Sequence, residues 1–198
     1  MKIYLPGDLI KDDVKASKVA IRSENGKTYA CVVGTVKDGF FKPFELAYIP
    51  SVNDKIIGIV YEKKAKIAFV DTGTAFNGIV QLTNEINIEQ GSIIMAKVMK
   101  IEDDNNLLLT DVKTLKKENA MLIFIHPSKI ARIIGKEGSM LSLIKEKTQC
   151  QILIGLNGYI VIYGKNVKNV IKAINFIVER ANLENLTNQV SSLLSKGG

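Results

Sequence analysis

The spacing of hydrophobic and polar positions changes twice along this chain of 198 residues. The first part contains short β-rich runs separated by turn residues, and the middle part contains five further short runs. The last part switches to the spacing of amphipathic helices. These changes predict three domains, at residues 1–50, 51–118 and 119–198. A chain of this length is sufficient for two or three separate hydrophobic cores.

The first fifty residues predict a small β domain. Residues 29–36 form a β-rich run, with Asn25-Gly26 as a strong turn signal before it and residues 37–39 as another after it. No residue pattern in this segment indicates chemistry. We therefore expect it to be structural or to contact another protein, and a role in docking is the leading interpretation.

The middle segment predicts a five-stranded barrel of the OB type. The expected strands span residues 55–61, 66–71, 78–82, 93–101 and 107–110. Gly58 stands where the first strand must bend, and residues 102–106 form a polar hairpin tip. Periodicity alone also allows another small barrel or a sandwich.

The last segment predicts the order strand, helix, helix, strand, strand, helix. Residues 121–125 are the first strand, Ser128 caps a short helix that Gly135 ends, and Asn166 caps the long helix. Two strands, 151–154 and 159–163, flank the turn signal Asn157-Gly158. Beyond this unit an apolar stripe packs on its own domain or on a partner: Leu183, Leu186, Val190 and Leu193.

The positive charge of the chain is concentrated in this last segment. Residues 119–198 carry 10 basic and 4 acidic side chains, a balance of +6 within a net charge of +7 for the whole chain. Such an excess favours a polyanion through counterion release, although a solvated lysine surface has the same composition. Charge alone leaves both interpretations open.

Histidine and cysteine are too scarce for a metal centre. Cys31 and Cys150 are far apart in sequence and form no Cys-x-x-Cys pair, so we expect two buried, reduced thiols in an intracellular protein. The chain has no run of about 18 apolar residues and no signal-peptide pattern at its start, so we expect neither a membrane span nor secretion.

The connection between the two short helices of the last segment carries the strongest chemical signal. Gly135 and Gly138 flank two residues, and glycine lets a sugar-phosphate chain approach the backbone closely. The next helix directs its N–H groups at the same place, and Lys129, Arg132 and Lys136 add positive charge. This pattern predicts a clamp on the nucleic-acid backbone, although two glycines also occur in plain helix–helix turns.

Taken together, these residues resemble the KH domain, here of type I (βααββα), and residues 58–85 resemble the S-one RNA-binding domain of the OB class. The opening Leu5-Pro6-Gly7-Asp8, the domain order and residues 155–158 are similar to the S-one/KH cap subunit of the archaeal exosome, the ribosomal RNA-processing protein four family. The resemblance covers essentially the whole chain. It implies a multidomain protein, mainly β with an α+β KH domain.

The resemblance also implies a function. Members of this family are non-catalytic subunits, three of which cap a hexameric ring of RNase-PH-like subunits and feed RNA 3′ ends into its pore. The implied partners are single-stranded RNA, the ring, and further copies or a sister cap subunit in the trimer. The implied location is the cytoplasm, with no cofactor. The alternative is a free-standing S-one/KH RNA chaperone or a translation-associated factor.

The barrel departs from the S-one pattern in the residues that stack on RNA. Only Phe69 keeps an aromatic ring on the second strand, so we expect weak RNA binding, mainly through Lys63, Lys64 and Lys66. Phe69 has a second interpretation, as a core residue. The pair Gly155 and Gly158 is interpreted as a hairpin turn, since Asn-Gly is turn chemistry.

Nothing in the sequence predicts a catalytic centre. The cluster Glu102-Asp103-Asp104 resembles a Mg²⁺ site in composition, but its position between two apolar strands is typical of a solvated hairpin tip. His126 has no cysteine or serine partner in any motif and is interpreted as structural. We therefore expect a protein that is not an enzyme.

Overall fold

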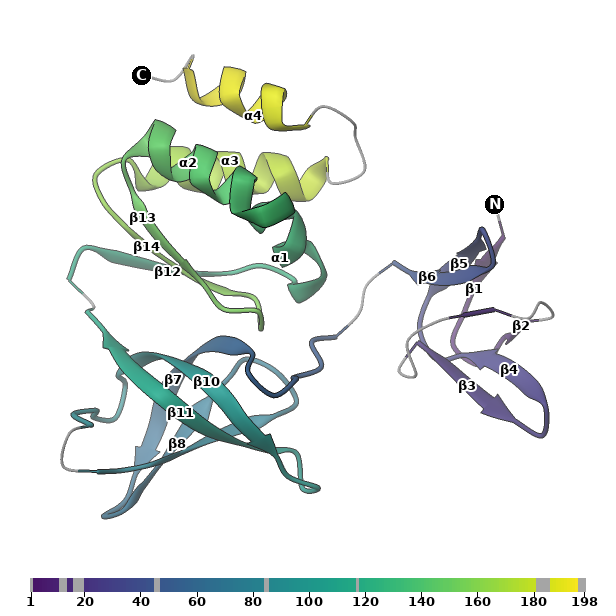
Figure 1. Ribbon diagram of the computed structural model, residues 1–198, viewed down its shortest axis with the longest axis horizontal. Helices are drawn as coiled ribbons and strands as arrows, with labels where there is room; N and C mark the ends of the chain where they lie inside the picture. The colour runs from purple at the N-terminus through teal and green to yellow at the C-terminus, as the bar shows by residue number, and fades with distance from the viewer. Residues whose placement is uncertain are drawn as a thin grey trace. The chain divides into compact units, whose positions relative to one another are not determined.

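The computed structural model describes residues 2–10, 14–15, 20–44, 47–83, 86–116, 118–180 and 186–195 (Figure 1). The chain divides into two compact units, Met1–Ala47 and Tyr48–Gly198. The fold is mainly β, with a five-stranded closed barrel followed by a KH domain, as the sequence predicts. Among the described residues, no helix is long and apolar enough to span a membrane.

The first unit contains two three-stranded sheets, of order β1-β5-β6 and β2-β4-β3. Positive φ angles at Asn25 (51°) and Gly26 (72°) close the hairpin between β3 and β4, and those at Asp38 (54°) and Gly39 (74°) close that between β5 and β6. Both predicted turns are therefore present. The strands are β1 (Ile3–Tyr4), β2 (Leu9–Ile10), β3 (Ile21–Glu24), β4 (Lys27–Ala30), β5 (Gly34–Lys37) and β6 (Phe40–Pro43).

The β-rich run over residues 29–36 is not one strand. A bend at residues 31–33 separates β4 from β5, which belong to different sheets. Cys31 lies in this bend and is exposed, so the expectation that it is buried is wrong, whereas Cys150 is buried. The bend turns the chain between two layers, which local β propensity does not reveal.

The second unit begins with the closed barrel, whose strand order around the wall is β7-β8-β9-β11-β10. β9 and β11 pair in parallel and every other pair is antiparallel, which is the OB arrangement. The predicted fifth strand extends further, to Leu115. The strands are β7 (Lys55–Lys63), β8 (Ile67–Asp71), β9 (Asn77–Gln81), β10 (Ile93–Ile101) and β11 (Asn106–Leu115).

Gly58 is required by close packing between neighbouring strands. A Cβ at this position would meet the side chain of Val70 and would lie 2.8 Å from the carbonyl oxygen of Asp71, both on β8. Real Cβ atoms do not approach other atoms so closely, so any other residue would push β8 away from β7. The glycine predicted at the bend therefore serves the approach of the next strand.

The KH domain follows with an antiparallel sheet of order β12-β14-β13. The first three helices lie along one face of this sheet (Figure 1). The element order is that of a type I KH domain. Its elements are β12 (Ala120–Phe124), α1 (Pro127–Ile134), the 3₁₀ turn η1 (Lys136–Gly138), α2 (Ser139–Thr148), β13 (Gln151–Ile154), β14 (Tyr159–Tyr163) and α3 (Val167–Glu179).

Two helix caps differ from the sequence prediction. α1 begins at Pro127 and its N-cap is His126, whose Nδ1 accepts a hydrogen bond from the backbone N–H of Ser128 at 3.4 Å, so Ser128 is not the cap. Asn166 does occupy the N-cap position of α3. Its side chain makes no capping bond there and instead donates to the carbonyl of Thr148 at 3.0 Å.

The apolar stripe after the KH order packs on its own domain. α4 (Leu186–Ser195) buries Leu186, Val190 and Leu194 against the KH core, which also contains residues of α2 and α3, whereas Leu193 of the predicted stripe is half-buried. Leu183 lies outside the described residues. The stripe therefore packs on the KH helices of its own domain, which is the first of the two interpretations from the sequence.

The turn between β13 and β14 joins the KH domain to the barrel. The side chain of Asn157 is 0% exposed, and its Oδ1 accepts from the backbone N–H of Ile57 at 3.1 Å. Its Nδ2 donates to the carbonyls of Ile57 (2.6 Å) and Thr72 (2.8 Å). In addition, the N–H of Leu156 donates to the carbonyl of Lys55 at 2.9 Å. One buried amide thus satisfies three backbone groups of the barrel.

Aromatic contacts extend the same junction. Tyr159 packs edge-on against Phe124, with ring centroids 5.5 Å apart, and its ring fills the space where a Cβ on Gly73 would stand. Burial raises the pKa of Tyr159, and the carboxylate of Asp71 raises it further. Tyr159 therefore stays protonated and neutral at the barrel surface.

Candidate nucleic-acid interface

The connection between α1 and α2 has a backbone that depends on glycine. Gly135 ends α1 with φ 76° and ψ 175°, and Gly138 stands directly before α2 with φ 81° and ψ 8°. Between them, Glu137 also has a positive φ, of 52°. Three left-handed φ values within four residues turn the chain sharply between the two helices.

The two glycines serve different purposes. A Cβ on Gly135 would lie 2.7 Å from the Cβ of Met140 and 2.8 Å from its backbone nitrogen, so this glycine is needed for the fold itself. A Cβ on Gly138 would meet nothing within 4 Å. The surface in front of Gly138 is therefore open to an approaching backbone, while that at Gly135 is filled by α2.

The open glycine stands at the N-terminus of α2. Gly138 is its N-cap and offers no side-chain hydrogen bond to the first turn, and that turn contains no acidic residue. The N–H of Ser139 donates to the carbonyl of Lys136, and the rest of this turn, without a side-chain cap and at the positive end of the helix dipole, is suited to an anion such as a phosphate. The geometry has the features expected of a backbone clamp.

The three cations predicted for the clamp lie within eight residues of one another. Arg132 is exposed in the last turn of α1, Lys129 is half-buried one turn before it, and Lys136 is exposed in η1. Glu137, which sequence reasoning did not weigh, is exposed beside Lys136 and offsets its charge. The loop thus relies on its backbone and on α1 for positive potential.

The barrel residues predicted to bind RNA lie together in the hairpin of β7 and β8, but two of the three lysines are paired. The Nζ of Lys63 lies 2.7 Å from Oε1 of Glu89, and the Nζ of Lys64 lies 3.4 Å from Oε1 of Glu62. Lys66 is exposed and forms no salt bridge among the described residues. Paired lysines contribute less net charge toward an RNA strand than their number indicates.

Phe69 is directed outward rather than into the barrel. It lies between the fully buried Ala68 and Val70 on β8, and the ammonium of Lys64 stands 4.8 Å from its ring centroid. The interpretation of Phe69 as a core residue is therefore wrong, because alternation along the strand places it on the outer face.

Tyr61 is an aromatic residue of this face that sequence reasoning missed. It is 45% exposed, and its ring centroid lies 6.1 Å from that of Phe69. A bulge between Val60 and Glu62 places Tyr61 on the outer face of β7. Tyr61 follows the buried Val60, so the alternation of inner and outer residues along the strand could have placed it on the outer face. The pair provides a surface on which a base can stack.

No cluster of three histidine, cysteine or acidic side chains suitable for a metal ion occurs among the described residues. The acidic tip between β10 and β11 is a hydrogen-bonded turn. Asp104 accepts from the backbone N–H of Asn106 at 3.2 Å and from its side-chain amide at 2.6 Å, and Glu102 lies 3.5 Å from the Nζ of Lys100. These contacts are typical of a hairpin.

Comparison with known proteins agrees with this geometry. The family model of the KH domain matches residues 121–179. The chain is 31% identical over 212 residues to the exosome complex component Rrp4 of Methanosarcina mazei, covering 98% of this chain and 81% of that protein. It is 32% identical over 213 residues to the Rrp4 of Thermoplasma acidophilum, covering 98% of this chain and 90% of that protein.

A solved structure shares the fold. The crystal structure of a protein described as a candidate exosome complex RNA-binding protein aligns with a TM-score of 0.67 and 24% identity, covering 76% of this chain and 97% of that one. At this identity the likeness supports the fold alone.

Proposed function

The chain belongs to the Rrp4 family of exosome complex components, and on that premise we propose that it is a non-catalytic RNA-binding subunit of an exosome. The observation that carries the proposal is the open glycine at the N-terminus of α2. Gly138 leaves space for a phosphate in front of helix N–H groups that no side chain caps.

RNA binding is assigned to two surfaces of the second unit. In the KH loop, Gly135 shapes the turn, Gly138 admits the phosphate, and Lys129, Arg132 and Lys136 supply positive potential. On the barrel, Lys66 and the partly paired Lys63 and Lys64 attract the strand, while Tyr61 and Phe69 stack on its bases. The phosphate backbone contributes most of the affinity.

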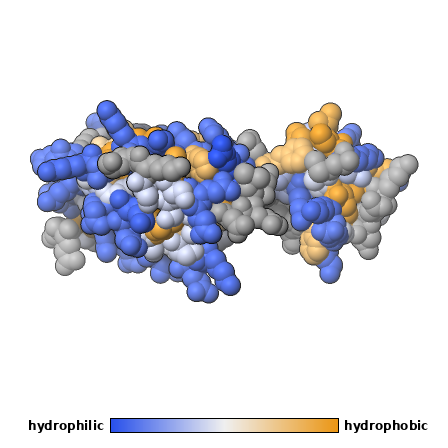
Figure 2. Space-filling view, turned by 90° about the horizontal axis from the view of Figure 1, so that it is seen from above, coloured by the Kyte–Doolittle hydropathy of each residue, from blue (hydrophilic) through white to orange (hydrophobic). Residues whose placement is uncertain are grey.

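Docking to a ring of RNase-PH-like subunits is assigned to the first unit. Its surface exposes several large apolar side chains, and Figure 2 shows hydrophobic patches on this unit. They are Ile3, Leu5, Leu9, Val33, Phe40 and Phe44, each at least 38% exposed. Exposed apolar surface of this kind on a small unit favours a protein partner.

The contribution to RNA degradation comes from multivalency. Three copies on one face of the ring would surround its pore with weak RNA-binding surfaces and raise the effective concentration of a bound strand. The ring supplies the chemistry, and the cap, located in the cytoplasm and without a cofactor, supplies retention of the substrate. The sister cap subunit can replace one or more copies.

The test is assembly with the RNase-PH-like ring. The full chain should bind the ring with three copies and raise its RNA affinity and degradation rate. Deletion of residues 1–47 should abolish assembly and leave RNA binding intact, because Tyr48 and Pro50 pack with the second unit and are retained. Leu5→Lys with Phe40→Lys should have the same effect, since both side chains are at least 50% exposed.

The matched control is Lys37→Gln with Lys42→Gln, two exposed residues of the same unit. This variant should assemble like the wild type. Assembly that survives the deletion would assign docking to the second unit. A chain that binds RNA but never assembles with any ring would support the alternative of a free-standing RNA chaperone.

A further inference from the structure

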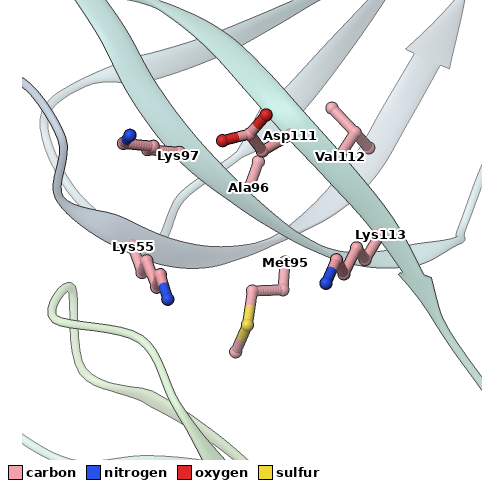
Figure 3. Close-up of a pocket in the computed structure, with 7 residues that line it drawn as sticks. All are labelled: Lys55, Met95, Ala96, Lys97, Asp111, Val112 and Lys113. Atoms are coloured by element: carbon pink, nitrogen blue, oxygen red, sulfur yellow. The ribbon is translucent and has the colours of Figure 1, made fainter.

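A pocket of about 420 Å³ lies on the outer wall of the barrel, on β7, β10 and β11. Three lysines line it, Lys55, Lys97 and Lys113, and the apolar side chains of Met95 and Val112 line it as well (Figure 3). β7 also carries Tyr61, but Lys55 stands at the first residue of that strand, and no RNA-binding residue assigned above lines the pocket. It is therefore a separate feature of the barrel.

The strand register places these cations side by side. Lys97 on β10 is the direct cross-strand partner of Lys55 on β7, and Met95 is the partner of Lys113 on β11. Like charges directly opposite one another on the same face of a sheet destabilise it. The arrangement lowers the stability of the unbound protein. An anion between the ammonium groups is attracted to both of them and offsets their repulsion.

No salt bridge neutralises these lysines within the part of the chain that the structure describes. This differs from Lys63 and Lys64, which pair with Glu89 and Glu62. One carboxylate, that of Asp111, lines the pocket, so three lysines and one acid leave a balance of two positive charges. The pocket therefore holds more uncompensated charge than the hairpin of β7 and β8.

Asp111 itself marks an irregular place in the wall. The register of β10 against β11 shifts between Met95 and Lys97, and Asp111 takes a left-handed φ of 52° in this bulge. Bulges re-aim neighbouring side chains and occur often beside binding sites. Here the bulge lies between Lys113 and the pair of Lys97 and Lys55.

The pocket also adjoins the junction with the KH domain. The backbone carbonyl of Lys55 accepts the hydrogen bond from the N–H of Leu156, which lies in the β13–β14 turn. Leu156 itself is 37% exposed. A ligand bound here would therefore contact the barrel next to the KH domain.

We propose that this pocket binds a nucleotide of single-stranded RNA, with the phosphate held by Lys55, Lys97 and Lys113 and the base or sugar on Met95 and Val112. The combination of cationic and apolar lining residues fits a nucleotide better than it fits an acidic peptide, whose carboxylates need no apolar contact. The inference rests on the proposed RNA binding and adds a third RNA contact to it.

The experiment measures RNA affinity of the full chain as a function of salt concentration, with a labelled single-stranded RNA of about 16 nucleotides. Lys97→Gln with Lys113→Gln should lower the slope of log K against log salt by about 1.4, which is two contacts of about 0.7 each. Lys97→Arg with Lys113→Arg should keep the wild-type slope. The matched control, Lys37→Gln with Lys42→Gln, should also keep it.

Folding of the variant is checked separately. Because Gln at position 97 removes the repulsion with Lys55, the thermal midpoint of the unbound double variant at low salt should equal or exceed that of the wild type. Inorganic pyrophosphate should raise the midpoint of the wild type more than that of the double variant.

The outcomes separate this inference from the proposed function. A wild-type slope in the folded double variant overturns the pocket as an RNA site. This holds even if pyrophosphate raises the thermal midpoint of the wild type more than that of the variant, since the pocket then binds an anion other than RNA. If the wild-type chain does not bind RNA at all, this contradicts the proposed function instead. A lower slope of log K against log salt in the control variant would show that any surface lysine contributes, wherever it lies, which also overturns the inference.

Discussion

The KH loop and the hairpin of β7 and β8 carry similar numbers of cations but present them differently. In the loop, the backbone shapes the proposed site, since Gly138 leaves the N-terminus of α2 open and no side chain caps it. In the hairpin, Lys63 and Lys64 are engaged by Glu89 and Glu62. The difference teaches that lysine content predicts attraction to RNA poorly until the ion pairs are known.

The KH domain and the barrel meet at the junction around Asn157, and removal of this side chain should have the largest effect. Asn157→Ala leaves the N–H of Ile57 and the carbonyls of Ile57 and Thr72 without their partner in a buried junction. The unfolding free energy should fall by about 3 kcal/mol, the upper end for a buried group left unpaired. Denaturant unfolding of the full chain measures this loss.

The control for this change lies one residue away. Leu156 is 37% exposed and contributes to the junction through its backbone, so Leu156→Ala should cost much less. Equal stability of Asn157→Ala and the wild type would show that the barrel and the KH domain do not depend on this contact.

A charge in front of the open glycine should have the next largest effect. Gly138→Asp places a carboxylate where a phosphate approaches and should lower RNA affinity about tenfold, which is about 1.4 kcal/mol. Gly138→Asn adds the same bulk without the charge, and both residues tolerate the left-handed φ, so Gly138→Asn should lose less affinity than Gly138→Asp. Fluorescence anisotropy with labelled RNA distinguishes the two.

Equal losses in both Gly138 variants would mean that bulk or strain, and not charge, governs the loop. Gly135 is a poor site for this test, because a Cβ there collides with Met140 and disturbs the start of α2. The clamp is thus tested at the glycine whose replacement the fold accepts.

Stacking on the barrel should have a smaller effect. Tyr61→Ala should weaken RNA binding by about 1 kcal/mol, the low end for loss of one stacked base, while Tyr61→Phe keeps the ring and should bind normally. Phe69→Ala should cost less, because Lys64 and Tyr61 already cover its ring. If Phe69→Ala has the larger effect in a folded protein, the order of the two rings is reversed.

Salt dependence gives the finest distinction between the two regions. Lys136→Ala should lower the slope of log K against log salt by about 0.7, as for one phosphate contact. Replacement of Lys63, Lys64 and Lys66 by Gln should also lower it by about 0.7, since Lys66 is the member without a salt bridge among the described residues. A drop of about 2.1 would show that the ion pairs open when RNA binds.

Much of this architecture could be predicted from the sequence, because turns and periodicity act locally. The Asn25-Gly26 hairpin, the five barrel strands and the order of the KH elements all follow from neighbouring residues. The roles that were missed depend on distant contacts. Asn157 signals only a turn in the sequence, and its amide finds partners 100 and 85 residues away.

The same limit explains the errors at the candidate site. Phe69 belongs on the outer face by alternation, yet only the position of Tyr61 shows that it forms part of an aromatic pair. The neutralisation of Lys63 requires Glu89, which is 26 residues away. Sequence identifies the lysines, whereas the fold decides which of them remain available.

The central claim is that this chain binds RNA and performs no chemistry on it, and one measurement tests both parts directly. The purified full chain is incubated with end-labelled single-stranded RNA, Mg²⁺ and phosphate, and binding and RNA length are followed in the same sample. We predict a bound RNA of unchanged length, as the proposed role of a non-catalytic RNA-binding subunit requires. Shortening of the RNA in a preparation free of other nucleases, or absence of binding, would contradict the account.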